Sequence, residues 1–169
     1  ISNDRIAELI SEAKTRVIYA APNVSDKIAA QLKHCGITKD DVMLRIVIDA
    51  DAEALRLGFG EVDGIKTLAD ANIDIRKAPG LRIGVLIVDE RAWVFSPTPE
   101  IIFDQPDDET FNAVEVSKDF AQQILVSIAP DQSIDKDDPI EAAVIPDSKE
   151  PEIGRERVTP NEISVIQQE

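Results

Sequence analysis

The sequence predicts an α/β fold in which a mixed, mostly parallel sheet is flanked by helices on both faces. Segments with helical periodicity alternate with short apolar runs along the first 130 residues, and this alternation is typical of layered α/β domains. Runs without polar residues, such as Val85–Val88, are typical of strands that are covered on both faces. The last predicted strands follow one another without a helix between them, which indicates an antiparallel edge.

The helices are predicted from apolar stripes and capping residues. The first stripe consists of Ile6, Leu9, Ile10 and Ala13. Asn3 or Asp4 is the expected N-cap of that helix, and Ser25 is the expected N-cap of a second helix over Asp26–Cys35, which Gly36 closes. Further helices are predicted over Ala52–Leu57, Gly64–Ala71 and Ser117–Ile128.

The strands are predicted from short apolar runs bounded by turn residues. They are Arg16–Pro22, Val42–Ile48, Ile73–Arg76, Leu81–Val88 and Ala92–Phe95. Pro79 and Gly80 predict a turn before the fourth strand, and Asp89–Arg91 predicts a hairpin after it. Two further apolar segments, Ile101–Phe103 and Phe111–Val116, flank an acidic loop.

Composition divides the chain near residue 130. Residues 1–130 are expected to form the α/β domain. Residues 131–158 are acidic and interrupted by proline, which favours a linker or an arm lying along the surface. Residues 159–169 begin with a helix-start pattern around Pro160, and we expect the start of a C-terminal helix that is cut short, as in a piece of a larger protein.

The charge and the rare residue types exclude several functions. The 33 acidic residues outnumber the 18 basic ones, for a net charge of −15, so direct binding to nucleic acid or to an anionic membrane surface is not expected. No apolar run is long enough to span a membrane. One cysteine excludes an internal disulfide, and with a single histidine no metal site or cofactor is expected. Without a secretory signal pattern, a cytoplasmic location is the expectation.

Three segments resemble one half of a phospholipase D superfamily enzyme. Arg16–Pro22 looks like the opening strand of that family, and Val42–Asp49 looks like its second strand, with an aspartate at the end. Asp74–Asp89 resembles the run that contains the signature histidine-x-lysine-x4-aspartate, which glycine-serine-x-asparagine follows six residues later. The resemblance covers roughly residues 3–128 and implies a phospholipase D-like half as the fold.

The signature is degenerate in this chain. Arg82 stands at the histidine position and Gly84 at the lysine position, whereas Asp89 keeps the aspartate. The positions of the later glycine, serine and asparagine are occupied by Ser96, Pro97 and Pro99. In the family the histidine is the nucleophile, and a guanidinium has no acceptor atom with which to replace it. The resemblance therefore implies a copy that is inactive as a phosphodiesterase, so no catalytic residue is assigned.

The sequence contains several other candidate sites. Arg76, Lys77 and Arg82 belong to the main concentration of positive charge, and a retained anion site there is the alternative to pairing with nearby carboxylates. His34 is expected to stabilise a helix C-terminus rather than to act on Cys35. The acidic loop Asp104–Thr110 lacks the ligand pattern of a calcium loop, and the glycine-rich segment after Leu57 is predicted to be a turn.

Trp93 and Phe95 share one face of the fifth predicted strand. They are either core residues or part of a partner-binding face, since single-signature members of the family pair as homodimers. The leading hypothesis is a non-catalytic module for oligomerisation or interaction, with a second copy or other domains of the same protein as partner. The alternatives are a regulatory domain that senses a small anionic or phosphate-containing ligand, and a phosphodiesterase or nuclease half that needs residues outside this chain.

Overall fold

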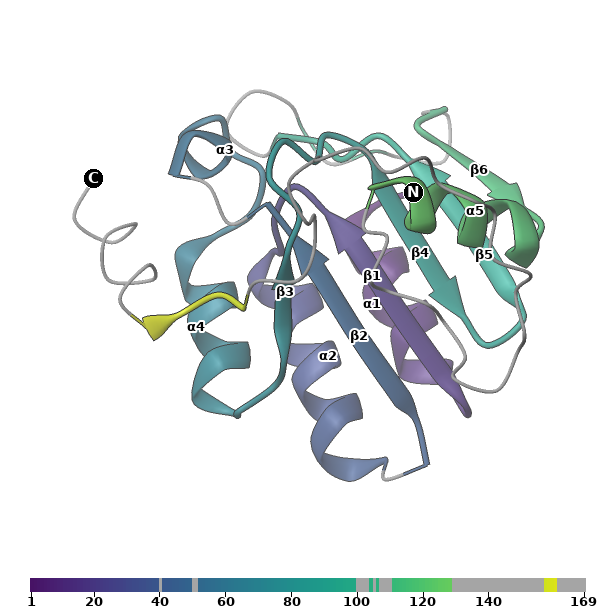
Figure 1. Ribbon diagram of the computed structural model, residues 1–169, viewed down its shortest axis with the longest axis horizontal. Coiled ribbons are helices and arrows are strands. Elements are labelled where there is room, and N and C mark those ends of the chain that lie inside the picture. The colour runs from purple at the N-terminus through teal and green to yellow at the C-terminus, as the bar shows by residue number, and fades with distance from the viewer. Residues whose placement is uncertain are drawn as a thin grey trace, which may run out of the picture.

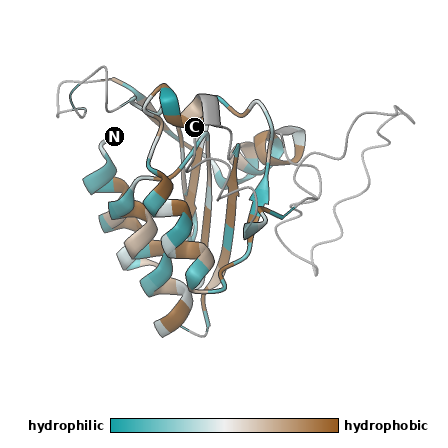
Figure 2. Cartoon of the chain, turned by 90° about the vertical axis from the view of Figure 1, so that its left-hand side faces the viewer, coloured by the Kyte–Doolittle hydropathy of each residue, from teal (hydrophilic) through white to brown (hydrophobic). Residues whose placement is uncertain are grey.

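The computed structural model describes residues 1–39, 41–49, 52–99, 104, 106, 111–128 and 157–160. Within these ranges, a six-stranded sheet has helices on both of its faces (Figures 1 and 2). The strands are β1 (Arg16–Ala21), β2 (Met43–Ile48), β3 (Ile75–Lys77), β4 (Gly84–Val88), β5 (Arg91–Phe95) and β6 (Ala113–Val116). The helices are α1 (Asn3–Glu12), α2 (Asp26–Thr38), α3 (Ala52–Arg56), α4 (Val62–Asp70) and α5 (Lys118–Ile128). The predicted α/β class is confirmed.

The sheet is mixed, with the strand order β3-β2-β1-β4-β5-β6. β1 pairs in parallel with β2, and β2 pairs in parallel with β3. The β1–β4, β4–β5 and β5–β6 pairs are antiparallel. The antiparallel part thus begins in the middle of the sheet and is larger than the antiparallel edge that the sequence indicated.

Two apolar cores lie on the two faces of the sheet. Side chains alternate between the faces along β1, so that Val17 and Tyr19 belong to one core and Ile18 and Ala20 to the other. The larger core includes the buried faces of α1, α2 and α4, and the smaller one includes Ala121 and Leu125 of α5. Figure 2 shows these two layers on opposite sides of the sheet. Because the strands are covered on both faces, their sequences are continuously apolar.

Several predicted boundaries are wrong by a few residues. Ser2, not Asn3 or Asp4, caps α1, because its hydroxyl accepts a hydrogen bond of 3.2 Å from the N–H of Arg5. α2 continues through Gly36 to Thr38. A Cβ on Gly36 would lie 3.0 Å from a methyl carbon of Leu44, so the glycine permits close packing instead of ending the helix.

β3 and β4 both start later than predicted, at Ile75 and Gly84. Leu81, Arg82 and Ile83 therefore lie in the loop between the two strands. Ile101–Phe103, most of the acidic loop, residues 129–156 and residues 161–169 lie outside the described residues. Within the described ranges, none of the helices is long and apolar enough to cross a membrane.

The outer edge of β3 is contacted by a distant segment of the chain. The N–H of Val158 donates to the carbonyl oxygen of Ile75 at 3.2 Å, and Arg157 forms an isolated antiparallel bridge with Arg76. The same segment appears in yellow beside β3 in Figure 1. Residues 157 and 158, which composition placed at the end of a linker or surface arm, thus lie on the sheet edge.

Candidate functional site

The candidate site lies at the edge of the sheet where β1, β2 and β3 end and β4 begins. Asp49 directly follows β2, and Arg82 precedes β4 in the loop that joins it to β3. In open α/β sheets, the carboxyl ends of parallel strands are where side chains for binding and catalysis converge. The residues that match the degenerate signature fall at this edge, except for Asp89.

A tight turn brings the chain from β3 back toward this edge. The N–H of Leu81 donates to the carbonyl oxygen of Ala78 at 3.1 Å, and Gly80 has a φ of 79°. Proline followed by a glycine with positive φ is typical of a type II turn, so the predicted Pro79–Gly80 turn is confirmed. The N–H of Gly80 donates to Oδ1 of Asp49 at 3.0 Å, which attaches the turn to the end of β2.

Arg82 forms an ion pair with Asp49. Nη1 of Arg82 donates to Oδ2 of Asp49 and, at 2.9 Å, to the carbonyl oxygen of Leu81. The Asp49 side chain is only 4% exposed, whereas that of Arg82 is 46% exposed. A buried carboxylate needs such partners because its desolvation is costly. The expectation that Arg82 projects from a strand was wrong, since it lies in the loop and turns toward β2.

The lysine position of the signature is filled by an aromatic ring. Gly84 pairs with Phe95 across β4 and β5, and a Cβ built on Gly84 would lie 2.3 Å from Cζ of Phe95. Distances below 3.0 Å are essentially never seen for real Cβ atoms. The Phe95 ring therefore occupies the space that any side chain at position 84 would need.

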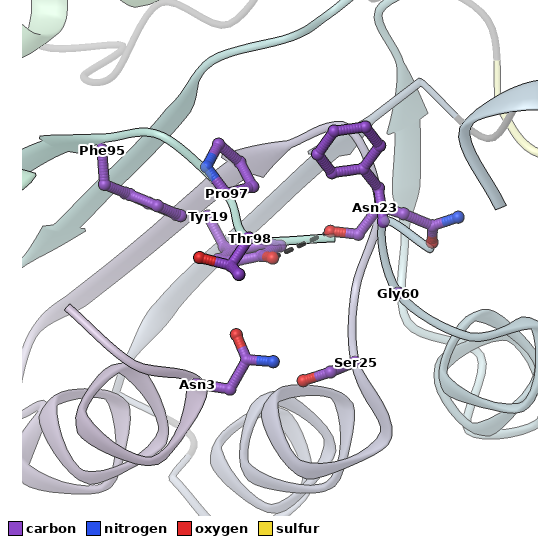
Figure 3. A pocket seen from close by; sticks show the side chains of 9 residues that line it. Asn3, Tyr19, Asn23, Ser25, Gly60, Phe95, Pro97 and Thr98 are labelled. Atoms are coloured by element: carbon purple, nitrogen blue, oxygen red, sulfur yellow. Dashed lines mark hydrogen bonds between the residues drawn. The ribbon is translucent and has the colours of Figure 1, made fainter. Parts of the chain in front are cut away.

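Beside this ring is a hollow of about 20 Å³, roughly the room of one water molecule. Figure 3 shows Asn3 and Ser25 at one side of it, and Pro97 and Thr98 at the other. The hydroxyl of Tyr19 donates to the carbonyl oxygen of Asn23 at 2.8 Å. Pro97, at the serine position of the signature, lines this small hollow.

Asp89 lies at the other end of β4 and holds the loop before β1. Its carboxylate accepts hydrogen bonds from the N–H groups of Lys14, Thr15 and Arg16, at 2.8 to 3.1 Å, and from the Thr15 hydroxyl at 2.9 Å. Burial raises the pKa of Asp89, but these hydrogen bonds outweigh it and lower the pKa below its ordinary value. The φ of 53° at Asp89 places it at the turn of the β4–β5 hairpin, where aspartate tolerates this conformation.

Of the three candidate anion-binding residues, Arg76 and Arg82 form ion pairs with carboxylates. Nε of Arg76 donates to Oδ2 of Asp74 at 2.7 Å, and Arg157 contacts the other oxygen of the same carboxylate. Lys77 ends β3, one residue after Arg76, so the two side chains leave the strand on opposite faces. An open hollow of about 420 Å³ lies beside the turn, lined by residues 78–83 and by Ser127 of α5.

Trp93 and Phe95 are core residues in this fold. Their side chains are 7% and 5% exposed and belong to the core on the α1 side of the sheet. They therefore offer little surface to a partner, and the exposed apolar residues nearby come from β6 and α5.

His34 is exposed, whereas Cys35 is buried in the core, where burial raises the pKa of its thiol. These two adjacent residues do not form a nucleophile–base pair.

The sequence did not single out Asp49 as a site residue. The sequence signal that could have identified it is an aspartate directly after a buried parallel strand, but its partner Arg82 is 33 residues away in the sequence.

The glycine-rich segment is a turn, as predicted: Gly58 and Gly60 have positive φ, and Gly60 packs against the backbone of Val24. Within the described ranges, no group of three or more histidine, cysteine, aspartate or glutamate residues could hold a metal ion.

Similarity to known proteins is found by comparing structures and not by comparing sequences. By sequence, the chain matches no family model and no curated protein. By structure, it is similar to Nuc from Salmonella typhimurium, a phospholipase D family member, with a TM-score of 0.51 and 19% identity over 73% of this chain and 82% of that one. TrmBL2, an archaeal chromatin protein, gives a TM-score of 0.43 at 14% identity over 73% of this chain and 44% of its own. The resemblance seen in the sequence is confirmed: the chain has a phospholipase D-like fold.

Proposed function

We propose that this chain is a non-catalytic phospholipase D-like domain that serves as an interaction module of a larger protein. The observation that carries the proposal is the Phe95 ring over Gly84, which fills the position of the signature lysine. A catalytic cation would have to occupy that space to stabilise a transferring phosphoryl group. At position 84, this space is instead filled by the Phe95 ring as part of the core.

The chemistry of Arg82 supports the same proposal. The nucleophile of the signature must present a nitrogen lone pair near pH 7, which an imidazole supplies and a guanidinium does not. Arg82 also donates to the buried Asp49 carboxylate and to the Leu81 carbonyl. Its position and charge are therefore explained by pairing with a structural carboxylate.

A hydrolysis assay tests the catalytic part of the proposal. The wild-type chain is expected to hydrolyse bis-(p-nitrophenyl) phosphate no faster than the buffer. The double variant Arg82→His/Gly84→Lys restores two signature residues, and we expect no gain, because the lysine side chain meets the Phe95 ring. Hydrolysis by the wild type that copurifies with the chain and falls in Arg82→Ala or His34→Ala would contradict the proposal.

A second candidate function is the sensing of a small anionic ligand. The observation that favours it is the hollow of about 420 Å³ beside Arg82, because a half-exposed guanidinium at the rim of a hollow is suited to oxyanions. Against it stands the ion pair with Asp49, which neutralises that guanidinium. Thermal unfolding with inorganic phosphate or sugar phosphates distinguishes the two: a concentration-dependent rise in Tm that Arg82→Gln abolishes would favour sensing.

A further inference from the structure

The outer edge of β3 is occupied by a segment of the same chain. Among the described residues, β3 pairs with β2 on its inner side, and Arg157 and Val158 lie along its outer side (Figure 1). The edge strand of a sheet presents N–H and C=O groups to which an extended peptide can bind. The chain therefore shows on itself how a peptide is held at this edge.

The segment is antiparallel to β3. Arg157 lies opposite Arg76 in an isolated bridge, and the N–H of Val158 donates to the carbonyl oxygen of Ile75 at 3.2 Å. Because side chains alternate between the two faces of a sheet, Val158 shares a face with Ile75, and Arg157 shares the opposite face with Arg76. Val158 accordingly packs against the core that contains Ile75, as a side chain of an added strand does.

The side chains at this edge match particular residue types in the ligand. Nε of Arg157 lies 3.0 Å from Oδ1 of Asp74, and Nε of Arg76 donates to Oδ2 of the same carboxylate at 2.7 Å. Oδ1 is therefore the oxygen that a basic residue of the ligand contacts, and the net charge of −15 favours a basic peptide over an acidic one. Pro160 lines the same hollow, and without an N–H it ends the pairing.

Residues 157–160 fill the site only in part. An open hollow of about 330 Å³ remains beside them, and its other walls are formed by Ala69, Asn72, Ile73, Asp74 and Ile75. Residues 157, 159 and 160 are exposed, and residue 158 is half-buried. Pockets that bind ligands begin at about 300 Å³. A longer peptide, or one with larger side chains, would therefore gain contacts that residues 157–160 do not make.

We propose that the outer edge of β3 is a strand-addition site for an extended segment of a partner protein, and that residues 157–160 occupy it when the partner is absent. The partner segment carries a basic residue for Asp74, then a β-branched apolar residue for the surface beside Ile75, and a proline two positions later. Residues 157–160 are thus an autoinhibitory segment that the partner displaces. This inference rests on the proposed function as an interaction module and names its surface and the chemistry of its partner.

Binding of a fluorescein-labelled peptide, followed by fluorescence anisotropy, tests the proposal. The peptide has the sequence of residues 155–161, Arg-Glu-Arg-Val-Thr-Pro-Asn. In the wild type, the chain's own segment competes at an effective concentration in the mM range, which raises the apparent Kd of a peptide with an intrinsic Kd of about 0.1 mM by about tenfold. The Val158→Pro variant, which loses the donor to Ile75, should therefore bind the peptide about tenfold more tightly than the wild type.

A second variant and a matched pair of substitutions control this measurement. Arg157→Glu sets a like charge beside Asp74 and should also expose the edge, so its Kd should fall as well; circular dichroism confirms that each variant folds. In the Val158→Pro background, Asp74→Asn should weaken peptide binding by about two- to fivefold, as expected for a partly exposed ion pair. Asp70→Asn makes the same charge change at an exposed position of α4 outside the hollow and should leave the Kd unchanged.

Amide hydrogen exchange locates the bound peptide. In the Val158→Pro variant, the peptide should slow exchange in β3 and leave β6, at the other end of the sheet, unchanged. Protection of β6 instead of β3 would overturn the β3 site while supporting an interaction module. The proposal would also be overturned if neither variant bound the peptide, or if the wild type bound it as tightly as the variants. In each case the hydrolysis assay judges the non-catalytic proposal separately.

Discussion

Gly84→Ala is expected to lower the free energy of unfolding, although alanine normally improves a strand position. Gly84 does not have a positive φ, so the backbone alone would favour alanine by about 0.5–1 kcal/mol. The new methyl group, however, would lie 2.3 to 2.6 Å from three carbons of the Phe95 ring. The ring is 5% exposed and would have to move by about 1 Å inside a packed core, which costs about 1–3 kcal/mol.

The measurement is urea unfolding followed by the fluorescence of Trp93, the single tryptophan, which lies in the same core. We expect a net loss of about 1–2 kcal/mol. Phe95→Leu removes part of the ring and should cost a similar amount by itself. In the double variant the two losses should not add, with a coupling of about 1 kcal/mol or more.

Gly80→Ala is the control for this prediction. Its φ of 79° makes alanine unfavourable by about 1–2 kcal/mol, but an added Cβ there meets nothing within 4 Å. Its loss should add to that of Phe95→Leu. If Gly84→Ala stabilised the chain, or if its effect added to that of Phe95→Leu, the ring would not be what fills the lysine position, and the proposal of a non-catalytic site would rest on Arg82 alone.

Three further predictions concern the contacts around the sheet. The fold lowers the pKa of Asp89, so its carboxylate stabilises the fold above its unfolded pKa of about 3.9, and this stability is lost as the pH falls through the folded pKa. Asp89→Asn should therefore cost about 1–2 kcal/mol at pH 7, and the difference from the wild type should shrink below about pH 4; a difference that stays constant down to acid pH would contradict this. Arg82→Ala leaves the buried Asp49 carboxylate without its cation and should cost about 1–3 kcal/mol. Asp49→Asn in the same chain should recover part of that loss in urea unfolding, and simple additivity would refute the pairing. Val158→Pro removes the hydrogen bond to Ile75, so we expect faster amide hydrogen exchange in β3 and unchanged exchange in α1; unchanged exchange in β3 would contradict an edge contact in solution.

The order of the elements was predictable because burial on both faces leaves a clear pattern. The apolar stripe of α1 and the continuous apolar run of β4 reflect which side chains the two cores contain. The ends of the strands were less predictable, because apolar residues are buried in loops as well as in strands. Leu81 is buried and so extends the apolar pattern, but it belongs to the turn that precedes β4.

The partners within the site were not predictable from local pattern. The sequence places Arg82 at a signature position, but the carboxylate that pairs with it comes from the end of β2. Alternation along a strand shows that Trp93 and Phe95 share a face, but it does not show whether the core or a partner covers that face. In the structure, this face belongs to the core that α1, α2 and α4 cover.

The two ends of β4 explain why one signature residue can remain while the others are replaced. Asp89 accepts hydrogen bonds from backbone N–H groups that would otherwise lack a partner at the start of β1, and this role does not depend on any reaction at the opposite end of the strand. Arg82 and Gly84 lie at that opposite end, where Arg82 pairs with Asp49 and the Phe95 ring packs against Gly84. The Asp89 carboxylate therefore has a structural role in stabilising the fold. Its presence at position 89 is therefore not evidence for phosphodiester hydrolysis.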